Sequence, residues 1–302
     1  MRDRRWRRLV PFAAAAVAVL TLASAASAVT IDDVELTGPE GATWDAEGDY
    51  TYGTSGGPCT GVDGTTQEKG YTPAADVSND FTSDAFDGGL YLLVNGDAYG
   101  DGVNQAKLSA AGHQLNVKAE EMAGLSVRRQ DRALTSSPTL RSLVTFTNPG
   151  ANDRTVNVVW DSAMGADGLE GTRASSTHDL VHTKADRWIA VSDDADSASL
   201  SDEPVLFVFS GVGASEKVRT VIWAPEDADP VSGIGQACIA VQFRITVPGH
   251  SQRALLFFTD VAMDNEDAIS QAPKYNRPHL GRKLLVGLTD RQLGEVLNWD
   301  LG

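Results

Sequence analysis

The sequence predicts an all-β protein, a large antiparallel β-sandwich with a short C-terminal helix, and three observations support this fold class. Of the 41 acidic residues 29 are Asp, and the chain holds 29 Gly; both residue types favour turns over helix interiors. Short segments of strand length, apolar or alternating, recur from about residue 89 to residue 259. Helical periodicity is confined to two short C-terminal stretches. The length of 302 residues is compatible with a supersandwich-like arrangement.

Residues 1–28 have the organisation of a cleavable export signal, which we expect to be helical. Five Arg lie among the first eight residues, an apolar run spans residues 9–22, and Ala-Ser-Ala at 26–28 forms a cleavage motif. The apolar run is too short to favour a stable membrane span. We expect cleavage near Ala28 and secretion to the periplasm or the medium, with residues 29–302 as a single β-sandwich domain. The residue directly after Ala28 is Val29 and not Cys, and no apolar tail follows the last helix, so we expect no stable membrane anchor.

The formal net charge of −16 limits the classes of partner. Residues 1–28 contain five Arg and one Asp, so the exported chain would carry a formal charge of −20. Such an acidic surface repels nucleic acid and anionic lipid. Carbohydrate and cell-surface proteins remain as expected partners.

The N-terminal half contains three strand signals. Residues 29–75 are rich in Gly and Thr and suggest an early hairpin, in which we expect Trp44 to be exposed. GLYLLVN at 89–95 predicts a buried strand. LRSLVTFTNPGANDRTVNVVWDS at 140–162 predicts two strands joined as a hairpin by the Asn-Pro-Gly turn.

Strand signals dominate the C-terminal half as well. Because VLFVF and ALLFF are apolar at every position, we expect their strands to be covered on both faces. In CIAVQFRITV the residues alternate, which places Ile239 and Phe243 on one face and Cys238 on the other. The predicted strands are Arg187–Ser192, Val205–Ser210, Val218–Trp223, Ile239–Val247 and Arg253–Thr259.

Two helices are expected near the C-terminus. The first covers Asp264–Ala272 and is stopped by Pro273. The second begins at a capping box formed by Thr289 and Gln292. Its apolar stripe is expected to seal one edge of the sandwich, and it contains Leu293, Val296, Leu297 and Trp299 or Leu301.

Cys59 and Cys238 are the two cysteines of the chain. An even number of cysteines in an oxidising compartment favours a disulfide, with two free thiols as the alternative. Two isolated cysteines are an unlikely metal site.

One segment is a candidate for Ca²⁺. In NGDAYGDGVNQ, the side chains of Asn95, Asp97 and Asp101 alternate with glycines, so their oxygens would converge on a cation. The segment does not match an EF-hand, and a plain Asp/Gly turn is the competing interpretation. No other cofactor is expected.

Catalytic motifs of the familiar enzyme classes are not found in the sequence, and the catalytic residues of any activity stay unknown. A glycosidase needs two suitably spaced carboxylates. Asp161, Asp167, Asp179 and Asp186 cluster near strand ends, but the sequence selects no pair among them. Solvated turn acids are the simpler interpretation, so we favour a protein that is not an enzyme.

The segments TFTNPGANDRTVNVVWDS, DRWIAVSDD and NWDL form a pattern over roughly residues 77–301. In this pattern the chain resembles a group of secreted bacterial β-sandwich proteins that have no known activity. The resemblance implies one exported β-rich unit and no reaction.

Three functional hypotheses follow. The favoured one is a secreted, non-catalytic β-sandwich, a structural or interaction module that binds carbohydrate or a surface partner. The second is a carbohydrate-active enzyme, a lyase, epimerase or hydrolase, which needs a concave sheet face lined by His, Arg, Asp and aromatic residues. The third is Ca²⁺-dependent adhesion.

Overall fold

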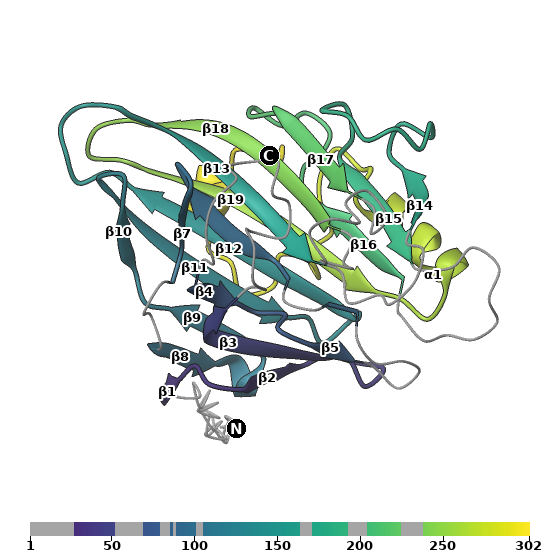
Figure 1. The fold of residues 1–302 in the computed structure, drawn as a ribbon. Coiled ribbons are helices and arrows are strands. Elements are labelled where there is room, and N and C mark those ends of the chain that lie inside the picture. Colours follow the sequence, from purple (N-terminus) through teal and green to yellow (C-terminus); the bar gives the residue numbers. More distant parts are fainter. Residues whose placement is uncertain are drawn as a thin grey trace, which may run out of the picture.

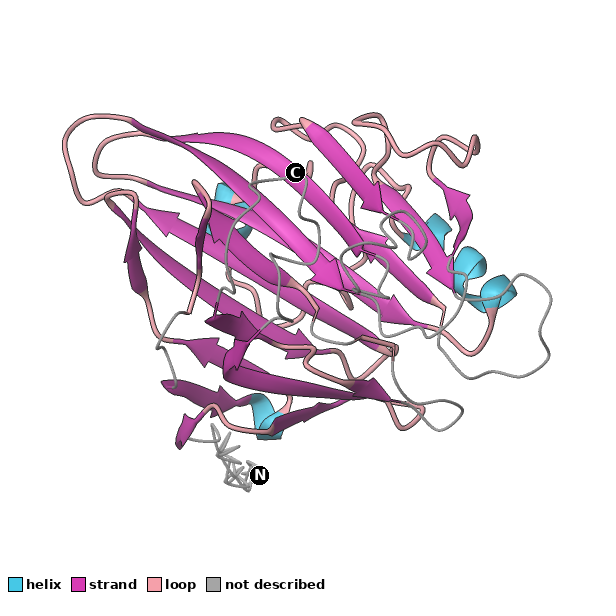
Figure 2. Ribbon diagram, viewed as in Figure 1, coloured by secondary structure: helices cyan, strands magenta, loops and turns pink. Residues whose placement is uncertain are grey.

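The computed structural model describes residues 27–51, 69–78, 85–86, 89–100, 105–163, 171–192, 204–224 and 238–302. These residues form antiparallel β-sheets with a few short helices, as Figure 2 shows. The predicted all-β fold class is therefore confirmed. None of the described helices is long and apolar enough to cross a membrane.

A ten-stranded sheet forms the back layer of the molecule in Figure 1. Strand β10 (Glu120–Met122) pairs only with β11. The order of the other strands is β1 (Ser27–Thr30), β8 (Gln105–Ser109), β9 (Gln114–Val117), β11 (Leu125–Ala133), β12 (Thr139–Thr147), β19 (Gln252–Val261), β16 (Val205–Val208), β15 (Trp188–Ser192) and β14 (Gly171–Ser175).

Two smaller sheets face the large one. The five-stranded sheet has the order β17 (Thr220–Ala224), β18 (Cys238–Val247), β13 (Arg154–Ala163), β6 (Tyr91–Val94) and β7 (Asp97–Ala98). The four-stranded sheet contains β2 (Val34–Thr37), β3 (Thr43–Thr51), β4 (Lys69–Thr72) and β5 (Val77–Ser78). All three sheets contribute buried side chains to one hydrophobic core.

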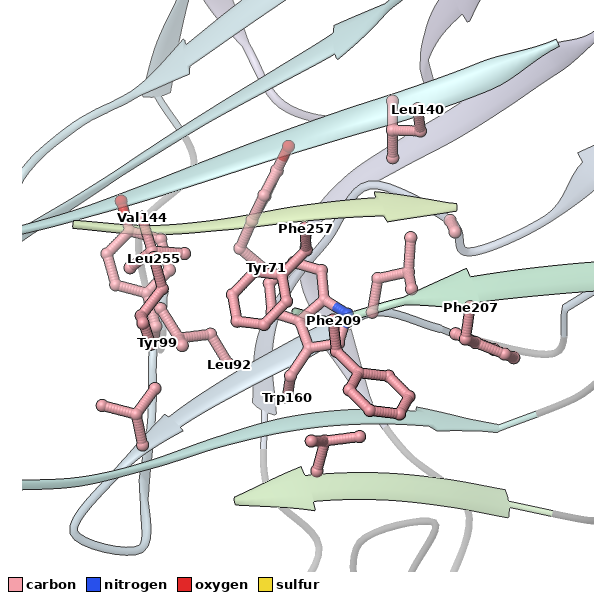
Figure 3. Close-up of a cluster of buried hydrophobic side chains, with 14 of the residues drawn as sticks. Tyr71, Leu92, Tyr99, Leu140, Val144, Trp160, Phe207, Phe209, Leu255 and Phe257 are labelled. Carbon is pink, nitrogen blue, oxygen red and sulfur yellow. The ribbon is translucent and has the colours of Figure 1, made fainter. Parts of the chain in front are cut away.

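The predicted alternation places side chains in this core. Residues Ile239 to Val247 of β18 point inward at every second position, as expected. Trp160 of β13 stacks on Phe257 of β19 with ring centroids 4.3 Å apart, so it joins the two facing sheets (Figure 3). Trp44 is also fully buried in this core. The expectation that Trp44 is exposed was wrong, because residue 44 faces inward on β3 although its sequence neighbours are polar.

The strands that are apolar at every position are buried on both faces, as predicted. In β16, Val205 and Phe207 face the inner core, whereas Leu206 and Val208 face a second core on the outer face of the large sheet. This outer core is covered by the C-terminal segment. The segment contains α1 (Asn265–Gln271), the 3-10 turn η3 (Ala272–Lys274) and α2 (Asp290–Glu295).

Helix α2 begins at the predicted capping box. The Thr289 hydroxyl accepts from the Gln292 backbone N–H, and the Gln292 side chain accepts from the Thr289 N–H. The helix ends earlier than the apolar stripe suggested, at Glu295. Beyond it Val296 forms a parallel bridge to Ala254, so the chain is extended there and covers the edge of β19 that β16 leaves free.

The predicted hairpin at residues 140–162 is wrong. Strand β12 lies between β11 and β19 in the large sheet, whereas β13 lies between β18 and β6 in the five-stranded sheet. Because both edges of β12 are already paired, no edge remains for β13. The Asn-Pro-Gly segment therefore carries the chain from one sheet to the other as an arch.

Asn148 fastens this arch to the neighbouring connection between β18 and β19. Its side chain is buried and donates to the carbonyls of Asn152 at 2.8 Å and Val247 at 2.9 Å. Its Oδ1 accepts from the Gly150 N–H at 3.0 Å. The Thr-Asn-Pro sequence at residues 147–149 therefore has a structural explanation. The side-chain amide of Asn148 joins the connection between β12 and β13 to the connection between β18 and β19.

Replacing Asn148 with Ala will lower the free energy of unfolding by about 2 kcal/mol, because buried backbone groups lose their partners. Urea titration measures the effect. Asn152→Ala is the matched control, since the Asn152 side chain is exposed in the same connection. Equal denaturation midpoints for the two variants would show that Asn148 does not fasten the arch.

Candidate functional site

The main candidate site is an open groove of about 840 Å³ on the outer face of the large sheet. The C-terminal segment covers this face over β19, β16 and β15 and over the ends of β11 and β12 at Arg132 and Arg141, but it leaves the rest of β11 and β12 and the strands β1, β8 and β9 uncovered. Gln252 of β19 and Gln292 of α2 also line the groove, on the side next to the covered part of the sheet. The groove therefore lies where the outer hydrophobic core stops.

The groove has an unusual composition for so acidic a chain. Its positive side chains are Lys107, Lys118 and Arg128, and all three are exposed. The residues that line it include no Asp, Glu, His or aromatic residue. The remaining polar lining consists of amides and hydroxyls, from Gln105, Asn116, Gln130, Gln252, Gln292, Thr30, Ser126, Thr145 and Thr147.

Strand β11 explains how the sequence places these groups. In LSVRRQDRA, Ser126, Arg128 and Gln130 point to the outer face, and Val127 and the other odd-numbered residues point to the inner core. The three polar residues therefore share one face, but Arg129 and Asp131 make the opposite face partly polar as well, so the sequence does not show which face is open. The sequence interpretation missed the groove floor because LSVRRQDRA was not among the predicted strands.

A network of amides holds the floor of the groove. Gln130 Nε2 donates to Asn116 Oδ1 at 2.9 Å, and Gln114 Nε2 donates to the same oxygen at 3.1 Å. Asn116 Nδ2 donates to the Lys107 carbonyl at 3.2 Å and to Ser109 Oγ at 3.0 Å. Gln130 Oε1 is buried and has no hydrogen-bond partner among the described residues. The floor thus presents fixed polar groups rather than mobile ones.

Carboxylates gather elsewhere in the described part of the chain. On β3, burial and the charges of Asp33 and Glu47 raise the pKa of Asp45 to about 6. None of Asp33, Asp45 and Glu47 lines the groove. The local charge of the groove is therefore opposite in sign to the charge of the whole chain.

The Ca²⁺ candidates lie away from this groove. Asn95 is in the two-residue turn between β6 and β7, and Asp97 begins β7. Asn95 Oδ1 already accepts a hydrogen bond, from the backbone N–H of Asn157 on the neighbouring strand β13, at 2.9 Å. Asp101 lies outside the described residues. In the described ranges no group of three or more His, Cys, Asp or Glu could hold a metal ion.

The predicted disulfide falls partly outside the structure. Cys238 is the first residue of β18 and lies opposite Ala163 of β13 and Ala224 of β17. Cys59 lies outside the described residues. The Cys59–Cys238 pairing stays a prediction.

The carboxylates near strand ends have structural partners where they are described. Asp186 is buried, and its two oxygens accept from Ser176, Thr177 and the Thr183 N–H. It therefore organises its own loop. Asp161 accepts from the Ser162 N–H, and Asp167 lies outside the described residues. The exposed Asp179 carboxylate accepts from Thr177 and the Val181 N–H, which lowers its pKa.

A second polar cluster is enclosed between the sheets. Arg129 and Asp131 are fully buried, with Arg129 Nε 3.0 Å from Asp131 Oδ2. Tyr71 donates to Asp131 Oδ2 at 2.7 Å, and Ser142 donates to Asp131 Oδ1. The guanidinium carbon lies 4.4 Å from the ring centroid of Trp160. Because no side chain of the ion pair reaches the surface, this cluster supports the fold rather than a ligand site.

Comparisons with known proteins find weak structural likenesses only. No family model matches the chain, and no curated protein matches it. Three solved structures share 8–12% sequence identity with it at TM-scores of 0.34–0.38. They are the Slr1438 protein from Synechocystis sp. PCC 6803, a putative aldose 1-epimerase from Klebsiella pneumoniae, and the polysaccharide lyase BACCELL_00875.

The extent of these matches differs. The matched regions cover 50%, 81% and 59% of this chain, and 62%, 89% and 26% of the respective structures. The chain thus spans less than two thirds of the Slr1438 protein and of the lyase. The likenesses are too slight to assign an activity.

Proposed function

We propose that this chain is an exported, non-catalytic β-sandwich protein that binds carbohydrate in the groove on the outer face of the large sheet. The observation that carries the proposal is the lining, which combines fixed amides and hydroxyls with three cations and no carboxylate. Amides and hydroxyls match the donors and acceptors of sugar hydroxyls. The cations favour a glycan that carries carboxylate or sulfate groups.

The same lining favours binding over catalysis. Glycoside hydrolysis needs a pair of carboxylates, and general acid–base catalysis usually uses His, Glu or Asp. None of these residue types lines the groove. The His, Asp and aromatic lining expected of a carbohydrate-active enzyme is likewise not found among the described lining residues.

Export would add one further charge to the groove. Ala28, Val29 and Thr30 of β1 line it, and Val29 pairs with Ala106 of β8. Cleavage after Ala28 would leave the α-ammonium group of Val29 at the wall of the groove. We therefore expect cleavage of the signal to reinforce the proposed preference for an acidic glycan, since it would add a cation at the site.

The double variant Lys107→Ala/Arg128→Ala will bind an acidic glycan at least about tenfold more weakly, because each charge-assisted hydrogen bond contributes about 1.5–3 kcal/mol. Calorimetric titration of the protein purified from a secreting host, with polygalacturonate oligomers and neutral glucan oligomers, measures this effect. The affinity of the original chain for polygalacturonate will also fall with added salt.

The matched control is Lys217→Ala/Arg219→Ala, which removes two exposed cations from the connection that precedes β17. It is expected to leave binding unchanged. If no acidic or neutral oligomer binds, or if the groove variant binds as tightly as this control, the proposed function is wrong.

A further inference from the structure

Two arginines lie side by side on the outer face of the large sheet, beyond the end of the groove. Arg132 of β11 is directly opposite Arg141 of β12 in the strand register. Directly opposite residues in an antiparallel pair have Cβ atoms about 4.5–5.5 Å apart. Neither arginine lines the groove. The two like charges are therefore held close together by the backbone itself.

These arginines have no acidic partner among the described residues. Arg141 is fully buried, and its Nη1 donates only to the carbonyls of Leu284 at 3.2 Å and Val286 at 2.7 Å. Its Nε and Nη2 have no hydrogen-bond partner in the part of the chain that the structure describes. Arg132 Nη1 donates to Gln114 Oε1 at 3.3 Å, and its Nε is buried without a partner. Three buried N–H-bearing nitrogens are thus unsatisfied at one place.

The electrostatics agree with this geometry. Burial, together with the charge of the neighbouring Arg132, lowers the pKa of Arg141 to about 9. Burial also lowers the pKa of Arg132. A buried cation normally has a counter-charge, since removing a charge from water without one is strongly unfavourable. Asp131 acts in the opposite direction, but it faces the inner core, where it pairs with Arg129.

Residues 284–287 of the C-terminal segment lie against the two arginines on the outer face of the sheet. The carbonyls of Leu284 and Val286 point at Arg141, and Gly287 lies against Arg132 with a φ of +80°. A Cβ at Gly287 would lie 2.5 Å from Arg132 Nη1. The guanidinium group of Arg141 is therefore enclosed between the sheet and residues 284–287, and the half-buried Arg132 side chain lies beside it.

We infer that Arg132 and Arg141 together bind one small oxyanion, such as sulfate, phosphate or a free carboxylate, beneath residues 284–287. Guanidinium groups present paired N–H donors that match the oxygens of such anions. The bound anion supplies the missing counter-charge and holds the C-terminal segment on the sheet. Neither arginine lines the groove, so this site is distinct from the proposed glycan site, although Arg132 contacts the groove floor through Gln114.

The test is thermal unfolding of the secreted protein with sulfate in the low-millimolar range, at constant ionic strength maintained with chloride. The expected result is a saturable rise in Tm of about 5 °C at a hundredfold excess of sulfate over its Kd. Arg132→Gln is expected to abolish the saturable rise. Arg219→Gln changes an exposed arginine in the connection that precedes β17; it is expected to retain the rise and corrects for the general stabilising effect of sulfate.

Crystals soaked in selenate provide a readout that does not depend on stability. We expect an anomalous peak between the two guanidinium groups of the original chain and none in Arg132→Gln. The inference is overturned if Tm shows no saturable response, if Arg132→Gln responds like Arg219→Gln, or if no selenium peak is found beside Arg141. Binding of chloride in place of sulfate would also overturn the assignment to an oxyanion.

Discussion

Replacing Asp131 with Ala will lower the free energy of unfolding by about 3–5 kcal/mol, the largest effect we expect from a single substitution in this chain. The variant leaves Arg129 fully buried between the sheets without its counter-charge. Arg129 would keep its donation to the Leu90 carbonyl and its position over the Trp160 ring, but neither is an anion. Tyr71 and Ser142 would lose their acceptor as well.

Urea titration with fluorescence detection measures the change, and a loss of this size is a large part of the total stability of a typical domain. The double variant Arg129→Met/Asp131→Leu shows whether the uncompensated charge of Arg129 causes such a loss of stability. If the uncompensated charge is the cause, removing both charges will restore most of the stability. Should Asp131→Ala unfold at the same urea concentration as the original chain, the buried pair contributes nothing and the assignment fails.

A surface pair provides the comparison. Arg291 and Glu295 are four residues apart on α2, with Arg291 Nε 3.2 Å from Glu295 Oε1 and the Arg291 side chain 77% exposed. Arg291→Ala, which removes the exposed member of this pair, is expected to change stability by no more than about 0.5 kcal/mol. The contrast between the two ion pairs tests burial rather than charge alone.

Replacing Asn298 with Ala will lower the free energy of unfolding by about 3–4 kcal/mol. The Asn298 side chain is fully buried and continues the strand ladder where β16 ends. Its Oδ1 accepts from the Leu256 N–H at 2.9 Å, and its Nδ2 donates to the carbonyls of Phe209 at 2.8 Å and Leu256 at 2.7 Å. Alanine leaves the Leu256 N–H and the Phe209 carbonyl buried without partners, and each unsatisfied group costs about 1–3 kcal/mol.

Hydrogen exchange locates this effect as well as measuring it. The Leu256 amide is expected to exchange much faster in Asn298→Ala, whereas amides of β13 in the other sheet keep their relative protection. Asn157→Ala is the matched control, because the Asn157 side chain is exposed on β13, and we expect a change below about 0.5 kcal/mol. Unchanged protection of Leu256 would mean that Asn298 does not complete the ladder.

The local features of the fold were predictable because they depend on neighbouring residues. The capping box of α2 needs only Thr289 and Gln292, and both bonds are present. Helix α1 (Asn265–Gln271) lies within the predicted range of Asp264–Ala272, and the Asp264 side chain caps it. The burial of β16 and β19 on both faces follows from their uninterrupted apolar residues, since a strand with two apolar faces needs cover on both.

The candidate site was not predictable in the same way. Alternation along β11 determines that Arg128 and Gln130 share a face, but not whether that face is covered. The covering depends on where the C-terminal segment, far away in sequence, stops on the sheet. Arg129 and Asp131 show the opposite case. A charged pair in a strand suggests a face exposed to solvent, but these two side chains are buried, and the guanidinium group of Arg129 lies over the rings of Tyr71 and Trp160.

The residue order therefore determines the class of fold, the faces of most strands and the caps of the helices, since these follow from side-chain period and local hydrogen bonding. Tertiary structure decides which sheet each strand joins, as the arch after β12 shows. It also decides which polar face stays open as a groove and which arginines lose contact with water. These outcomes depend on pairing between distant segments, because an edge or a face that one segment occupies is no longer available to another.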